Sequence, residues 1–215
     1  MDIRARREEI ANVFTHGLGA LASLGGGAVV ITLAAMMGDP WQLISAIVFC
    51  LSLLLLYAAS TIYHAVRDEL IKARLKVVDH CAIFILIAGT YTPFTLVGLR
   101  GGWGWTLFSI VWGLAVAGII FKLFCTGRLK VLSTLMYIGM GWLVLIAIKP
   151  MLRELPLMAL VWLLIGGLAY TVGTIFYHNK RIPYSHAIWH MFVLGGSTCH
   201  FIAVLSQVLP ANQVA

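Results

Sequence analysis

Residues 41–65 read WQLISAIVFCLSLLLLYAASTIYHA and contain no Asp, Glu, Lys or Arg. A helix needs roughly 20 apolar residues to cross the hydrocarbon core of a bilayer, so this stretch is long enough to span one. A strand of a membrane β-barrel would alternate apolar and polar residues, and this stretch does not alternate. It therefore predicts a transmembrane α-helix.

Stretches of the same kind fill most of the remaining chain. Of its 215 residues, 61% are hydrophobic and 11% are charged, whereas a soluble domain has about 45–50% apolar and about 25% charged residues. This composition excludes an ordinary soluble globular protein. Charges, glycines and prolines divide the chain into seven predicted spans, at 14–37, 41–65, 77–98, 103–124, 130–148, 157–177 and 185–209.

The turns between these spans are short, which makes neighbouring helices antiparallel. We therefore predict an all-α protein whose single domain is a seven-helix transmembrane bundle at residues 14–209. A cytoplasmic N-terminal segment at residues 1–13 precedes the bundle, and a short external tail at residues 210–215 follows it. The oligomeric state stays open at this point.

Lysine and arginine are concentrated on one side of the predicted bundle. The net charge is +7, and 12 of the 15 Lys and Arg residues fall in segments on the side of the N-terminus. An excess of basic residues marks the cytoplasmic side of a membrane protein. We therefore expect a cytoplasmic N-terminus and an external C-terminus. The positive charge is explained by topology, so no nucleic-acid partner is expected.

Histidines gather at the cytoplasmic end of this bundle. His186 and His190 are four residues apart, which places both imidazoles on one face of the last helix. Ser60 and His64 have the same spacing in the second span, so His64 can approach the pair from across the bundle. Three histidines with one open position are typical of a catalytic zinc site. We predict one Zn²⁺ per chain on His64, His186 and His190, although other metals also accept imidazole ligands.

A simpler interpretation of each motif has to be weighed as well. A His-x-x-x-His pair alone also fits interfacial histidines that bond lipid headgroups or backbone carbonyls. We expect His80 and His178 to be interfacial in this way. For His16 and His200 two interpretations stay open: each supports the metal site, or each makes an ordinary hydrogen bond within the bundle.

Asp79 is the only acidic residue that the prediction places inside a span. Zn²⁺ on three neutral imidazoles leaves two positive charges in a low-dielectric interior, which is costly unless they are compensated. Asp79 is therefore predicted to be catalytic, accepting a hydrogen bond or a proton from the water of the metal. Ser60 is predicted to hold that water or an oxyanion, unless it bonds to its own helix. The other acidic residues fall in predicted tails or loops: Asp2, Glu8, Glu9, Asp39, Asp68, Glu69 and Glu154.

Taken together, these motifs resemble those of the bacterial hemolysin III proteins. That family belongs to the progestin and adipoQ receptor superfamily of seven-helix membrane proteins, which is related to adiponectin receptors and alkaline ceramidases. The similarity covers nearly the whole chain. Its motifs are Glu9-x-x-Asn12-x-x-Thr15-His16, Ser60-x-x-x-His64, Asp79, Ala88-Gly89-Thr90-Tyr91-Thr92-Pro93, Ser185-His186-x-x-x-His190 and His200-Phe201.

The resemblance implies zinc on the same three histidines, with Asp79 and Ser60 beside the metal or its water. It places Asn12, His16 and His200 in supporting positions. It also implies a part in membrane lipid homeostasis through hydrolysis of a lipid amide or ester, in the manner of a ceramidase, with a membrane lipid as substrate or ligand. The chain lacks the long N-terminal cytoplasmic region of the animal receptors, so no protein hormone is expected to bind.

Other functions remain in competition with the hydrolase. The same zinc would tie helices together in a non-enzymatic membrane sensor or regulator. A pore-forming cytolysin is less favoured, because seven tightly connected apolar helices suit a protein that is always embedded. A transporter or proton pump is disfavoured as well, because no predicted span carries an acidic residue at mid-membrane depth.

Overall fold

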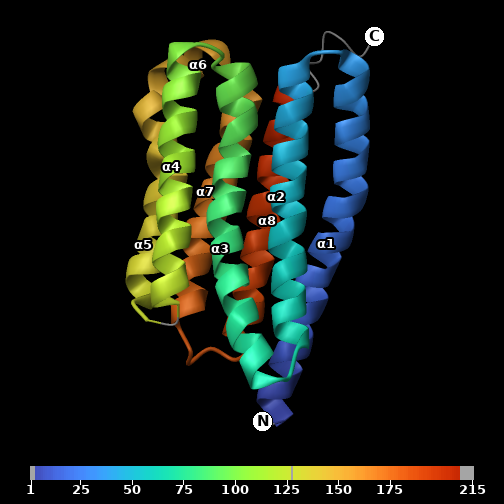
Figure 1. The fold of residues 1–215 in the computed structure, drawn as a ribbon, viewed down its shortest axis with the longest axis vertical. Coiled ribbons are helices and arrows are strands. Elements are labelled where there is room, and N and C mark those ends of the chain that lie inside the picture. Colours follow the sequence, from blue (N-terminus) through green and yellow to red (C-terminus); the bar gives the residue numbers. More distant parts are fainter. Residues whose placement is uncertain (1–2, 127, 209–215) are drawn as a thin grey trace.

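The computed structural model describes residues 3–126 and 128–208, and its regular elements are all helical (Figure 1). An antiparallel series of long helices runs from one end of the molecule to the other. Their bounds are α1 (Ile3–Met37), α2 (Pro40–Ala65), α3 (Glu69–Pro93), the π-helix η1 (Phe94–Gly98), α4 (Gly102–Cys125), α5 (Lys130–Gly141), the 3₁₀ helix η2 (Trp142–Ala147), α6 (Ile148–Glu154), α7 (Leu157–His178) and α8 (Ser185–Val208).

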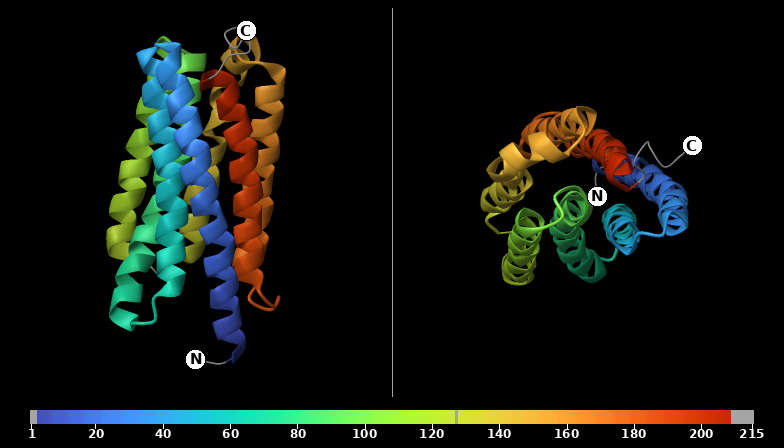
Figure 2. Two further views of the ribbon diagram at one scale, coloured as in Figure 1. Left: turned by 90° about the vertical axis from the view of Figure 1, so that its right-hand side faces the viewer. Right: turned by 90° about the horizontal axis from the view of Figure 1, so that it is seen from above.

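Within these residues, seven helical stretches are long and apolar enough to cross a membrane. One of them combines α3 with η1, and another combines α5, η2 and α6. The predicted all-α seven-helix bundle is therefore confirmed. Seen along the bundle axis, the helices form a ring in which α8 returns to the beginning of the chain (Figure 2). Because α8 contacts α1, α2 and α3, the last span lies beside the first three.

Two helices begin earlier than the sequence predicted. The starts expected at residues 14 and 77 are wrong, since α1 begins at Ile3 and α3 at Glu69. The hydropathy pattern stops at charged residues, but Arg, Glu and Lys are good helix formers and continue a helix beyond its apolar part. At α3 the Asp68 carboxylate also accepts a hydrogen bond from the backbone N–H of Ile71 at 2.9 Å, which caps the longer helix. The predicted external tail lies outside the described residues.

The fifth span, expected as one helix over 130–148, is interrupted at η2. The Tyr91 hydroxyl of α3 donates to the carbonyl of Gly141 at 2.8 Å and accepts from the backbone N–H of Val144 at 2.9 Å. These bonds satisfy backbone groups that would otherwise pair within an α-helix, so α5 ends where the tyrosine inserts.

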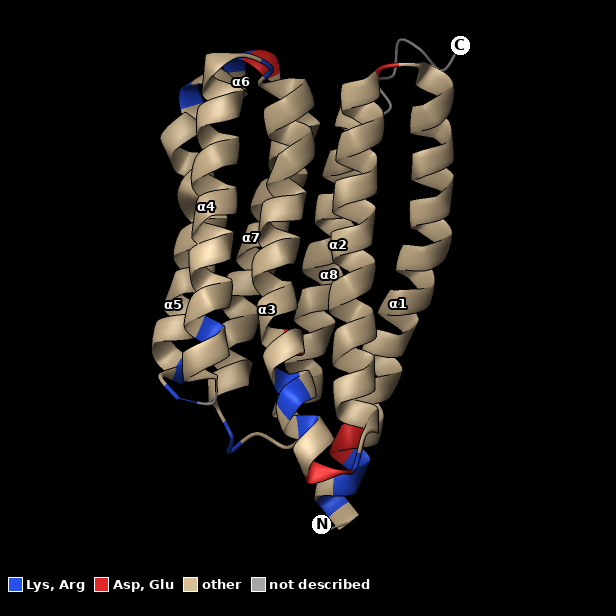
Figure 3. Ribbon diagram, in the orientation of Figure 1, with Lys and Arg blue, Asp and Glu red and all other residues tan. Residues whose placement is uncertain are grey.

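Lys and Arg residues collect at the end of the bundle where α1 begins, which we call the basic end (Figure 3). They lie at the start of α1, at the start of α3, around the α4–α5 turn and in the loop before α8. This distribution agrees with the loop-by-loop charge count. The cytoplasmic location of this end stays a prediction.

Contact between α1 and α2 depends on a glycine. A Cβ atom at Gly19 would lie 2.6 Å from Cδ1 of Tyr57, whose ring is buried and whose hydroxyl bonds the Val193 carbonyl of α8. We expect Gly19→Ala to lower the free energy of unfolding by about 1–3 kcal/mol, because the fixed ring cannot move away. Thermal unfolding in detergent would measure the loss. Gly25→Ala is the matched control in the same helix, since a Cβ there meets nothing within 4 Å; equal destabilisation by both changes would contradict the expectation.

Candidate metal centre

Three histidines from two helices meet at the basic end of the bundle. His64 lies in the last turn of α2, and His186 and His190 lie in the first two turns of α8. Their candidate ligand atoms all lie within 4.8 Å of one another. The contact of α8 with α2 brings them together, while the four-residue spacing aligns the pair within α8. The three rings therefore form one cluster that a single metal ion can share.

The hydrogen bonds of His64 test whether this cluster fits a metal. Its Nδ1 lies 2.6 Å from Oε2 of Glu9, and the other carboxylate oxygen accepts from Lys72 at 3.1 Å. A carboxylate only accepts, so Nδ1 carries the proton and Nε2 carries the lone pair. That Nε2 is buried and has no hydrogen-bond partner among the described residues. A buried lone pair directed into a group of histidines is what a metal ligand requires.

The other two histidines are also held by α1. Nδ1 of His190 lies 3.2 Å from the Thr15 hydroxyl, which itself donates to the Ala11 carbonyl at 2.9 Å and so accepts from the ring. The backbone N–H of His186 donates to Oε1 of Glu8 at 3.2 Å. Glu8 and Thr15 of α1 thus contact the cluster from outside, and the bond of Thr15 to the His190 ring is of the kind that fixes the tautomer of a metal-bound histidine.

Asp79 and Ser60 lie next to this cluster. Ser60 is buried one turn before His64, and the Asp79 carboxylate lies within interaction range of both. The Asp79 side chain is 13% exposed, and one of its carboxylate oxygens lies 3.6 Å from Nδ1 of His80. Nδ1 of His80 is already bonded to the Lys76 carbonyl at 2.7 Å. The carboxylate therefore remains available to groups inside the bundle.

Comparison of the sequence with known proteins shows the family of this chain. The sequence profile described as "Haemolysin-III related" matches residues 4–201. The chain belongs to this haemolysin-III-related family. It is 49% identical to the "Hemolysin-3 homolog" of Bacillus subtilis (strain 168) over 199 residues, which are 93% of each protein. It is 47% identical to "Hemolysin-3" of Bacillus cereus over 204 residues, 95% of this chain and 93% of the relative.

A more distant relative is human "Monocyte to macrophage differentiation factor". It is 28% identical over 205 residues, which are 92% of this chain and 83% of the human protein. The resemblance deduced from the motifs is therefore confirmed over the whole described bundle. Family membership and the seven apolar helices together make this chain a multi-pass integral membrane protein.

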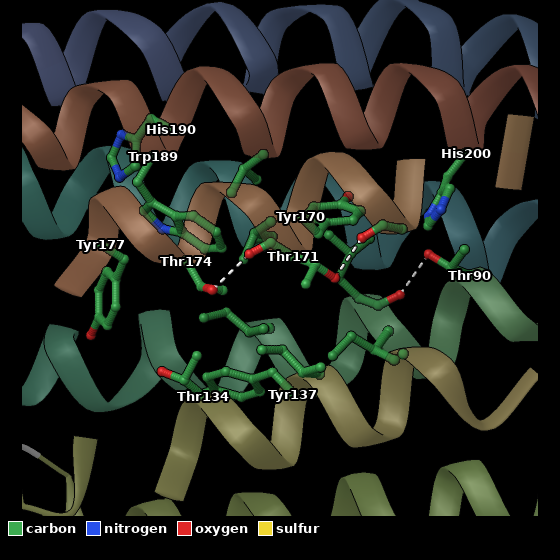
Figure 4. Close-up of a pocket in the computed structure, with 18 of the residues that line it drawn as sticks. Thr90, Thr134, Tyr137, Tyr170, Thr171, Thr174, Tyr177, Trp189, His190 and His200 are labelled. Atoms are coloured by element: carbon green, nitrogen blue, oxygen red, sulfur yellow. Dashed lines mark hydrogen bonds between the residues drawn. The ribbon is translucent and has the colours of Figure 1, made fainter. Parts of the chain in front are cut away.

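The structure separates the supporting residues of this haemolysin-III-related chain into two groups. His16 stacks on the His190 ring with centroids 3.5 Å apart, and Nδ2 of Asn12 lies 3.4 Å from Nδ1 of His64. His200 instead bonds the Leu163 carbonyl at 3.2 Å, toward the other end of the close-up in Figure 4. Asn12 and His16 thus adjoin the cluster, whereas His200 does not.

Sequence reasoning missed the part played by Glu8 and Glu9. The expectation that they lie in a tail before the first helix is wrong, because α1 starts at Ile3 and carries both to the histidines. A signal was present in the sequence. Glu9, Asn12 and His16 are spaced by three and four residues, which is one face of a helix that begins before residue 9.

A large cavity opens from the histidine cluster into the bundle. Its volume is about 900 Å³, and it extends from the basic end past His190 and His200 (Figure 4) to Leu152 of α6 near the opposite end. Apolar side chains such as Leu86, Leu107 and Val193 make up most of its wall, with a few hydroxyls from residues such as Thr90 and Thr171. Its size lies at the upper end of the range for ligand pockets, and its lining suits an acyl chain.

The bond between Glu9 and His64 leads to a prediction. We expect Glu9→Gln to weaken zinc binding about 10- to 100-fold, because the amide can donate to Nδ1 and favour the wrong tautomer. Competition with a fluorescent zinc chelator would measure the change in Kd. Glu154→Gln, in α6 at the opposite end, is the control and should leave the Kd unchanged. A Kd unaltered in both variants would show that Glu9 does not orient His64.

Proposed function

We propose that this haemolysin-III-related protein is a zinc-dependent hydrolase that cleaves an amide or ester bond of a membrane lipid. The observation that carries this proposal is the position of the cluster of His64, His186 and His190, which lies beside Asp79 at one end of a cavity with room for an acyl chain. Three neutral nitrogens with one open position are characteristic of catalytic rather than structural zinc. The substrate is thus a lipid whose polar linkage reaches the basic end.

When bound, Zn²⁺ supplies a Lewis acid and a water that is readily deprotonated near neutral pH. The residues of the chain supply the remaining functions. Asp79 accepts the proton of the attacking water and delivers it to the leaving group. The Ser60 hydroxyl donates to the oxygen that gains charge, while Glu9 and Thr15 hold the rings of His64 and His190 in place. The apolar wall of the cavity excludes bulk water from the chain of the lipid.

We further propose that the basic end faces the cytoplasm and that the enzyme contributes to lipid homeostasis in a bacterial cytoplasmic membrane. The charge distribution supports the orientation (Figure 3). The bacterial membrane is supported by two Bacillus proteins that align with this chain over nearly its full length.

The test uses purified protein reconstituted in lipid nanodiscs. Zinc content is measured first, and the protein is then supplied with a ceramide-type amide and with a diacyl ester lipid. We expect one zinc per chain and release of a fatty acid from at least one substrate, detected by mass spectrometry. Release should stop after treatment with a chelator and resume when zinc is added. One bound zinc without any product would instead favour a sensor or regulator in which the metal only joins helices.

A further inference from the structure

Six basic side chains line the cavity at its basic end. They come from α1, α3, α4, α5 and the loop before α8, so they converge from separate parts of the fold: Arg4, Lys76, Lys122, Lys130, Lys180 and Arg181. The metal cluster does not use them. Their shared position, at the mouth of a cavity that is apolar further in, indicates a second binding site.

Lys122 is the most informative of these residues. It is 2% exposed, and its ammonium group donates to the Ser133 hydroxyl at 2.6 Å and lies 5.7 Å from the centre of the Tyr137 ring. Among the described residues, no carboxylate lies within ion-pair distance of it. Burial of an ammonium group that contacts only a hydroxyl and an aromatic ring costs free energy, because no negative charge compensates it. An anion in the adjoining cavity would supply the missing negative charge.

The neighbouring lysines increase the positive charge that an anion would compensate. Lys76 lies within electrostatic range of Lys122, Lys130 and Lys180, and like charges repel one another. Asp79 is the acidic group that acts on Lys76, one helical turn away, and it also faces His64. Glu8 and Glu9 line the same cavity, but Glu8 accepts from the backbone N–H of His186 and Glu9 is paired with His64 and Lys72. Three carboxylates therefore face six basic side chains, and positive charge remains in excess.

Membrane topology alone does not account for this arrangement. Lys130 and Lys180 are exposed, as expected of basic residues that face the cytoplasm. Lys122 instead points inward and lines the cavity, although the sequence alone would assign it to the same loop. A long lysine side chain near the end of a span normally reaches toward water.

We propose that the basic end of the cavity binds the phosphate of an anionic phospholipid, with one acyl chain of that lipid in the apolar part. Lysine ammonium groups bind phosphate as point charges, and here several surround one opening. A free phosphate would use only the charged mouth, whereas a phospholipid uses the mouth and the apolar wall together. Binding of the phospholipid does not require the metal. The further step, in which the bound lipid is presented to the metal, rests on the proposed hydrolase function.

Native mass spectrometry of the purified full chain in a neutral detergent would test this. The probes are short-chain phosphatidylglycerol, phosphatidylcholine with the same acyl chains, and inorganic phosphate. We expect phosphatidylglycerol to bind at least about tenfold more tightly than phosphatidylcholine, and each lysine to contribute about fivefold. Lys122→Met should therefore lower the preference about fivefold. Lys149→Met, an exposed lysine at the opposite end, is the matched control and should preserve it.

Lys122→Met also removes the contact with Ser133. Lys130→Gln and Lys180→Gln change exposed lysines, so they test the same lipid preference without loss of a buried contact. Equal binding of the two lipids, or the same loss in Lys149→Met, would overturn the site. Displacement of the lipid by an equal concentration of inorganic phosphate would overturn the lipid assignment. A headgroup preference in zinc-loaded protein that releases no fatty acid would support this site while contradicting the hydrolase, and hydrolysis without any headgroup preference would do the reverse.

Discussion

His190→Ala is expected to abolish stoichiometric zinc binding. The ring supplies one of three nitrogens in the cluster, and its Nδ1 is held by Thr15 so that Nε2 is available to a metal. Loss of a ligand should cost more than the roughly 10- to 100-fold that follows from loss of an outer partner. The zinc content per chain, measured by elemental analysis after dialysis against a weak chelator, should fall from one toward zero.

His200→Ala is the matched control for this change. It removes the same type of side chain from the same helix and from the wall of the same cavity, but its partner is the Leu163 carbonyl. We expect it to keep one zinc per chain. Equal zinc content in the two variants would show that the cluster is not the metal site. Loss of zinc from both would point to a general loss of folding, which circular dichroism of each variant would reveal.

Much of the fold follows from properties of single segments. The span at 41–65 is apolar over its whole length, and α2 covers Pro40–Ala65 as predicted within one residue. The pairing of His186 with His190 likewise depends only on the helical repeat. Their approach to His64 was predicted from a common depth in the membrane, and the contact of α8 with α2 provides it.

Features that depend on contacts between helices were not predictable in this way. The start of α1 was placed too late because hydropathy cannot distinguish a charged helical turn from a charged tail. Tyr91 interrupts the fifth span from α3, so the break at η2 has no signal within residues 130–148 itself. Lys122 lies close to the end of its span, so its sequence alone predicts a lysine that faces water. Only the packing of the helices shows that it points into the cavity.

Asp79→Asn is expected to lower the rate of lipid hydrolysis by about 10²- to 10⁴-fold, the usual contribution of a general acid–base group. Asparagine preserves the size of the side chain, but it cannot accept the proton of the attacking water. Zinc content should stay at one per chain, because Asp79 is not among the three clustered ligands. The rate of fatty-acid release and the zinc content, measured on the same preparation, separate chemistry from metal binding.

Asp39→Asn provides the comparison for this last change. Asp39 caps α2 at the opposite end, where its carboxylate accepts from the backbone N–H of Trp41 at 2.8 Å, and asparagine is an equally good cap. Its rate should therefore match that of the wild type. An unchanged rate in Asp79→Asn would remove this residue from the reaction. Loss of zinc together with activity would instead make Asp79 part of what holds the metal, and the proton would then have to pass through another group of the cavity.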